Sequence, residues 1–130
     1  MPNRKKTILL IDDDAQLIHL LHEKLENSGF GVLDAHNGVS GIAMAKEKEP
    51  DLIILDLRMP GMNGAEVLAA LKSDEAAKNI KVIIFTFFNQ FSGLKFDETT
   101  AKKIGADAFI EKESDLDEIV KKVKDLLGIV

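Results

Sequence analysis

The side chains that could take part in chemistry stand directly after short apolar runs of this sequence. In chain order they are Asp12, Asp13 and Asp14, then Asp56, then Thr86, and finally Lys112. If these groups meet, several carboxylates crowd together, and like charges at such range oppose joint ionisation. A hard divalent cation relieves that repulsion, and oxygen ligands without any Cys favour Mg²⁺.

Thr86 and Lys112 would complete such a site. A hydroxyl, an ammonium and a bound cation around a free carboxylate form a cradle for a phosphoryl group. A carboxylate in that cradle can act as a nucleophile and form an acyl phosphate. The residues therefore predict phosphoryl chemistry at a carboxylate, supported by a metal ion.

The groups meet only if the apolar runs are strands of one parallel sheet. Ile8–Ile11, Leu52–Leu55 and Val82–Phe85 are continuously apolar, which indicates strands buried on both faces. Gly31–Ala35 and Asp107–Ile110 are weaker strands. Because the carboxyl ends of parallel strands share one edge of a sheet, ligands bind outside that edge.

Amphipathic stretches alternate with these strands. The predicted helices cover Leu17–Leu25, Val39–Ala45, Val67–Leu71, a short piece near Asp97–Ile104, and Leu116–Leu127. Asp14 suits the N-cap of the first helix, and Ser114 with Asp117 has capping-box spacing before the last. Five strands alternating with five helices predict one doubly wound α/β domain over residues 1–130.

Composition excludes several other classes of protein. The chain has 130 residues, no Cys and a net charge of -5, which argues against direct nucleic-acid binding through phosphate contacts. The absence of Cys excludes disulfides and thiolate catalysis, and it fits a reducing compartment. No apolar run approaches the length of a membrane span, and the basic N-terminus is not a signal peptide.

Taken together, these motifs resemble the receiver domain of two-component response regulators, of the single-domain chemotaxis type. The matching stretches are Ile8–Asp14, Asp56–Gly64, Ile84–Thr86 and Gly105–Lys112. The resemblance covers nearly the whole chain, and it implies a flavodoxin-like fold with strand order 2-1-3-4-5 and a cytoplasmic location.

The resemblance also implies a role for each site residue. Asp56 would accept a phosphoryl group from a phosphohistidine of a sensor histidine kinase or a histidine phosphotransfer protein. Asp13, Asp56 and the backbone carbonyl of Arg58 would hold Mg²⁺, with Asp12 acting largely through water. Thr86 and Lys112 would contact the phosphoryl oxygens.

Phe109 stands where the family has its switching aromatic residue, so a downstream protein target would read the change. No output domain follows the last predicted helix, so output would be by protein contact, or the chain is part of a longer one.

Two departures from the family pattern lie beside the site. Glu113 follows Lys112 where the family usually has proline, and Phe87 follows Thr86 where a small residue is usual. The Phe87 ring either covers the site and slows its chemistry, or turns into the core. Five of the seven Phe residues fall between Phe85 and Phe96, as a satellite core or an exposed docking patch.

Two other functions compete with phosphoacceptor signalling. One is a degenerate receiver that binds proteins without carrying phosphate, which only Phe87 and Glu113 support. The other is a phosphatase of the haloacid dehalogenase type. Asp12 and Asp14 imitate the two aspartates, two residues apart, of its nucleophile motif. Ala15 does not fit that phosphatase motif, and the chain is short for that class.

Overall fold

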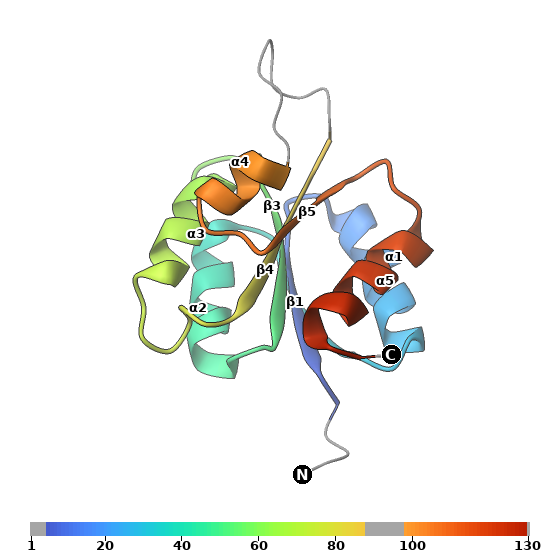
Figure 1. Cartoon of the computed structure of the whole chain (residues 1–130). Helices are drawn as coiled ribbons and strands as arrows, with labels where there is room; N and C mark the ends of the chain where they lie inside the picture. Colours follow the sequence, from blue (N-terminus) through green and yellow to red (C-terminus); the bar gives the residue numbers. More distant parts are fainter. Residues whose placement is uncertain (1–4, 88–97, 130) are drawn as a thin grey trace.

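The sheet is parallel throughout and has five strands in the order β2-β1-β3-β4-β5 (Figure 1). The structure is a computed structural model, and it describes residues 5–87 and 98–129. The strands are β1 (Thr7–Ile11), β2 (Gly31–Ala35), β3 (Leu52–Asp56), β4 (Lys81–Thr86) and β5 (Ala108–Glu111). The three most apolar strands, β1, β3 and β4, occupy the middle of the sheet, as predicted.

A helix follows each strand, and the helices between strands return the chain to the end of the sheet where the strands begin. The described helices are α1 (Ala15–Asn27), α2 (Gly38–Lys48), α3 (Gly64–Lys72), α4 (Glu98–Lys103) and α5 (Leu116–Leu127). Asp14 caps α1, because its side chain accepts a hydrogen bond from the Leu17 N–H, as predicted. None of the described helices combines the length and the apolarity that crossing a bilayer requires.

The capping box predicted before the last helix is wrong. The N-cap of α5 is Asp115, whose side chain accepts a hydrogen bond from the Glu118 N–H. Ser114 instead donates its backbone N–H to the Glu111 carbonyl and lies in the preceding turn. A carboxylate at this position also suits the positive end of the helix dipole better than a hydroxyl does.

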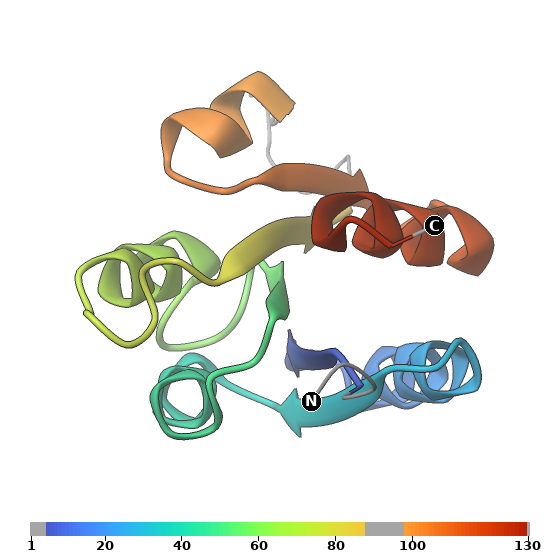
Figure 2. The ribbon, with the colours of Figure 1, turned by 60° about the horizontal axis from the view of Figure 1, so that its bottom comes forward.

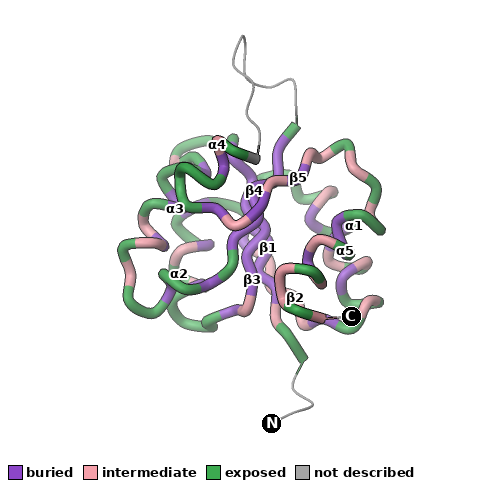
Figure 3. Tube along the Cα trace, in the orientation of Figure 1, coloured by how far each residue is buried: buried purple, intermediate pink, exposed green. Residues whose placement is uncertain are grey.

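Two apolar layers hold the sheet between its helices (Figures 2 and 3). Helices α2, α3 and α4 cover one face, and α1 and α5 cover the other. Alternate residues of each strand enter the two layers, so that Ile53 and Leu55 face α3 while Leu52 and Ile54 face α1 and α5. The strands are therefore fixed on both faces, and their carboxyl ends are held rigidly in register.

Candidate functional site

The predicted site residues meet at the carboxyl edge of the sheet, which is the upper edge in Figure 1. Asp12 follows β1, while Asp56 and Thr86 are the last residues of β3 and β4. Asp56 is paired with Phe85 and Thr86 with Glu111, so the neighbouring strands end at one level. Lys112 follows β5, and its backbone N–H donates to the Thr86 carbonyl oxygen at 2.9 Å.

Three carboxylates form the acidic part of the site. One ligand oxygen each from Asp12, Asp13 and Asp56 lies within 4.8 Å of the others. Asp12 and Asp56 are buried, with 4% and 3% of their surface exposed, whereas Asp13 lies at the solvent side. This arrangement of hard oxygen donors, open on one side, fits a magnesium ion that keeps some of its water.

Lys112 is the cation that the fold itself brings to these carboxylates. Its Nζ lies 2.8 Å from Asp12 Oδ2 and 3.3 Å from Asp56 Oδ1, and its side chain is 5% exposed. One ammonium thus serves two buried carboxylates, with Asp13 close by. The site retains an excess of negative charge that a divalent cation would balance.

Burial and charge together change the pKa of each group. Burial raises the pKa of Asp56 to about 7, and the neighbouring Asp12 charge adds to this, while Lys112 and the Arg58 N–H oppose it. Burial likewise raises the pKa of Asp12, although Lys112 partly offsets the change. Burial alone would lower the pKa of Lys112, but its contacts with Asp12 and Asp56 outweigh that effect and raise it.

The loop after β3 holds Asp56 in place through its backbone. The exposed Arg58 donates its N–H to Asp56 Oδ1 at 3.3 Å, and Gly64 donates its N–H to the Leu57 carbonyl at 2.9 Å. A Cβ atom on Gly64 would press on the Asp56 carbonyl oxygen and lie 2.7 Å from Leu57 Cα. The missing side chain of Gly64 thus permits the close approach of α3 to the Asp56 backbone.

The Thr86 hydroxyl has no hydrogen-bond partner among the described residues, although Thr86 is only 1% exposed. Buried hydroxyls nearly always have a hydrogen-bond partner, and one without a protein partner indicates a place for a ligand. An oxygen of a phosphoryl group on Asp56 is a suitable partner. The residues present therefore fit both the metal ion and the phosphoryl group.

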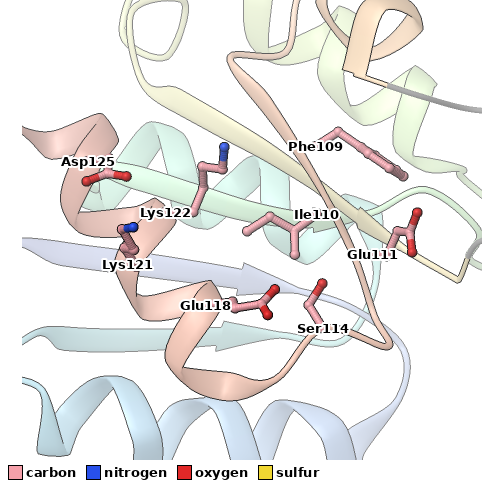
Figure 4. A pocket seen from close by; sticks show the side chains of 8 residues that line it. All are labelled: Phe109, Ile110, Glu111, Ser114, Glu118, Lys121, Lys122 and Asp125. Carbon is pink, nitrogen blue, oxygen red and sulfur yellow. The ribbon is translucent and has the colours of Figure 1, made fainter.

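Phe109 is half-buried in β5 and packs against the apolar layer beneath α3 and α4. Its Cα partner in β4 is Ile84, two residues before Thr86 on the same face of the strand. Phe109 also borders a hollow of about 410 Å³ between β5 and α5 (Figure 4). It thus connects the layer next to Thr86 with the surface of the molecule.

Phe87 lies beside the site and not in the core. The ring centroid is 5.3 Å from Lys112 Nζ, and 37% of the residue is exposed. The buried Phe85 ring approaches the same nitrogen, with its centroid at 5.7 Å. The sequence analysis did not predict this contact between Lys112 and two rings. A signal for it was present, because Phe85 and Phe87 are two residues apart and Lys112 follows the neighbouring strand. The other phenylalanines of the predicted cluster, Phe88, Phe91 and Phe96, lie outside the described residues.

The phosphatase alternative loses its second aspartate. Asp14 is committed to capping α1 through its Oδ1, which lies 3.1 Å from the Leu17 nitrogen. Asp12 is in turn paired with Lys112 and accepts the Asp14 N–H at 3.0 Å. The pair of aspartates therefore serves the helix start and the lysine contact.

Comparison with known proteins identifies the family. The model of the response regulator receiver domain matches residues 8–124, so the chain belongs to the receiver domains of two-component response regulators, a family of signalling domains. Receiver domains of this family typically bind Mg²⁺ at an acidic pocket and interact with kinases or phosphotransfer proteins and downstream targets.

Individual relatives agree with this. The polar-differentiation response regulator DivK of Brucella anthropi is 30% identical over 123 residues, which cover 95% of this chain and 97% of that protein. A CheY-like receiver domain protein from Methanospirillum hungatei is 27% identical, with a TM-score of 0.82 over 96% of this chain and 95% of its own. The chemotaxis protein CheY4 of Vibrio cholerae, 22% identical over 94% and 98% of the chains, shares the fold with a TM-score of 0.82. The predicted flavodoxin-like fold and receiver class are confirmed.

Proposed function

We propose that Asp56 accepts a phosphoryl group from a phosphohistidine of a sensor kinase or a phosphotransfer protein. The observation that carries this proposal is the buried Asp56 carboxylate, held 3.3 Å from Lys112 Nζ beside a Thr86 hydroxyl that has no hydrogen-bond partner among the described residues. A lysine and a hydroxyl next to a carboxylate supply a cation and a donor for phosphoryl oxygens. The alternative of a binding module without phosphate gains no support from this geometry.

In the transfer, an Asp56 oxygen forms a bond to phosphorus as the bond between phosphorus and the histidine nitrogen breaks. Lys112 and Thr86 contact the phosphoryl oxygens and hold them in line with the leaving nitrogen. Asp13, Asp56 and the Arg58 carbonyl would hold Mg²⁺, with Asp12 acting largely through water. When bound, the ion neutralises charge on the carboxylates and the phosphoryl oxygens.

In this account the chain is a phosphoacceptor that assists its own phosphorylation and dephosphorylation, and it is not an enzyme with a separate substrate. It works in the cytoplasm, and a downstream protein reads its state. Residues 1–130 act as one domain.

The output of the switch starts from Thr86. When the Thr86 hydroxyl bonds to the phosphoryl group, space changes in the layer where Phe109 packs, because both face the same side of the sheet. A shift of the Phe109 ring alters the hollow between β5 and α5 that it borders. Thr86 and Phe109 would therefore couple the site to a partner-binding face.

Intact mass spectrometry tests the proposal. After incubation with acetyl phosphate and Mg²⁺, the wild type should carry one phosphoryl group, and chelator should prevent this. Asp56→Asn should carry none. Asp34→Asn, the same substitution at the half-buried Asp34 of β2, should label like the wild type. Equal labelling of Asp56→Asn would refute the assignment, and an unlabelled wild type would favour the module that carries no phosphate.

A further inference from the structure

We infer that Phe85 is a positioning residue for the phosphoryl transfer, whose ring supports the Lys112 ammonium where that group meets the acidic site. The inference rests on the proposed function. It gives a role in the reaction to a residue of the apolar layer beneath α1 and α5 that is only 1% exposed.

The Lys112 side chain has to reach across a strand to meet its carboxylates. The strands lie in the order β1-β3-β4-β5, and Lys112 directly follows β5. Its Nζ lies 3.3 Å from Asp56 Oδ1, at the end of β3, and 2.8 Å from Asp12 Oδ2, after β1. Neighbouring strands are about 4.8 Å apart. The lysine side chain therefore passes the end of β4 before it reaches either carboxylate.

Phe85 lies on β4 at that crossing. Its Cα partners are Asp56 on β3 and Ile110 on β5, and Lys112 comes two residues after Ile110. Lys112 Nζ lies over the Phe85 ring, 5.7 Å from its centroid, within the distance of about 6 Å at which a cation is attracted to an aromatic face. Because the ring is buried in the core, its place does not depend on the lysine.

An aromatic ring suits the buried ammonium better than an aliphatic side chain would. Its π face is negative, so it attracts the cation without replacing a carboxylate as hydrogen-bond acceptor. An aliphatic side chain would offer no attraction on that side, and a buried charge costs stability unless it is compensated. The attraction also has no single acceptor atom. The Lys112 ammonium can therefore shift from a carboxylate to a phosphoryl oxygen while it stays over the ring.

Phe85→Leu removes the π face and keeps a buried apolar side chain. Phe30→Leu is the matched control, because Phe30 is 3% exposed in the same apolar layer but directly precedes β2, at the end of the sheet away from the site. The Phe30 ring has no lysine contact in the part of the chain that the structure describes. Phe87, whose ring also approaches Lys112, stays unchanged in every variant.

The rate of loading is the functional measurement. Each protein is mixed with acetyl phosphate and Mg²⁺, and the phosphorylated fraction is followed over time by intact mass. Phe85→Leu should load about fivefold more slowly than the wild type, and Phe30→Leu should stay within about twofold of it. Melting curves of the same samples show whether each variant is folded. If Phe85→Leu does not fold, Phe85→Met, with a flexible apolar side chain, replaces it and should load equally slowly.

A double-mutant cycle with Lys112→Met separates action through the lysine from packing. Urea denaturation in Mg²⁺ gives the unfolding equilibrium constant of each single and double variant. Phe85→Leu should raise this constant about fivefold less in the Lys112→Met background than in the wild type, because the ring then has no ammonium to support. Phe30→Leu should raise it by the same factor in both backgrounds, since distant changes are additive.

The possible failures are distinguishable. A labelled wild type with Phe85→Leu loading as fast as Phe30→Leu overturns the inference and leaves the proposed function standing. Slow loading of Phe85→Leu without coupling to Lys112→Met shows that the ring acts by packing alone, which also overturns it. A wild type that takes up no label refutes the proposed function, and with it any role of Phe85 in the transfer.

Discussion

Two groups of charged side chains in this molecule are built in opposite ways. Between α1 and β2, His22 Nδ1 lies 2.8 Å from Asp34 Oδ1 and Nε2 lies 3.2 Å from Glu26 Oε2. Each ring nitrogen has its own carboxylate, and His22 and Asp34 are 27% and 30% exposed. At the carboxyl edge of the sheet, one lysine serves two carboxylates whose side chains are only 3–6% exposed.

The difference separates stability from function. The His22 group is satisfied by the contacts among its own members, so it supports the fold without needing a ligand. The Asp56 group is buried with excess negative charge, and its Thr86 hydroxyl has no partner among the described residues, so under the proposed function it costs stability until a cation and a phosphoryl group bind. A site that binds its ligand through charge has unbalanced charge and unfilled hydrogen bonds when the ligand is absent.

The largest expected effect on stability comes from adding a Cβ atom where the backbone is closely packed, and it should differ between the two regions. Gly64→Ala should lower the free energy of unfolding by about 2–3 kcal/mol, because a Cβ there meets the fixed backbone of Asp56 and Leu57. Gly31→Ala, on the strand that carries Asp34, should change it by less than about 0.5 kcal/mol, since its Cβ finds Thr7 Oγ1 at an ordinary 3.6 Å. Urea denaturation measures both. Similar losses for the two variants would show that the site backbone is no more constrained than the edge strand.

A smaller effect should appear as a pH dependence of the His22 group. The hydrogen bond to Asp34, helped by its charge and by Glu26, outweighs partial burial and raises the pKa of His22. The folded state thus holds the His22 proton more tightly than the unfolded chain does. The resulting stability is fully present below the ordinary histidine pKa and is lost as the pH rises through the raised value.

His22→Gln should therefore lower the free energy of unfolding by no more than about 1 kcal/mol near pH 5.5, and by less near pH 8. His19→Gln, on the same helix, is the control. The His19 side chain is 78% exposed, and its one ion-pair contact among the described residues is with Glu23, at 3.5 Å. Denaturation at several pH values measures the difference. A loss that grows with pH would contradict the assignment of a protonated, paired His22.

The sequence was sufficient to predict the sheet and the residues at its carboxyl edge. Continuous apolar runs identify strands buried on both faces, and parallel strands bring the residues that follow them to one edge. Asp12, Asp56, Thr86 and Lys112 could be placed together on that basis alone. Strand and helix ends differed from prediction by one to three residues, as at β5, where Glu111 and not Asp107 belongs to the strand.

What the sequence did not reveal depends on contacts between distant elements. The pairing of His22 with Asp34 needs the packing of α1 on β2, and the periodicity of α1 indicates only that His22 is near the edge of its buried face. The role of Gly64 depends on how closely α3 approaches β3, which no local pattern encodes. The start of α5 was misplaced because Ser114 and Asp115 are both good capping residues, and the turn after β5 decides between them.

The measurement that tests the central contrast most directly is the free energy of unfolding of the wild type, Asp56→Asn and Asp34→Asn near pH 7.5, in chelator and in Mg²⁺. In chelator, Asp56→Asn should be more stable than the wild type by about 1 kcal/mol, because it removes a buried charge that the site disfavours. Asp34→Asn should be less stable by about 0.5–1 kcal/mol, because it weakens the bond to His22. Mg²⁺ at about a hundred times its Kd should stabilise the wild type by about 2–3 kcal/mol and Asp56→Asn by much less. Opposite signs for the same substitution would support the account, whereas a loss of stability in both variants, with no response of the wild type to Mg²⁺, would contradict it.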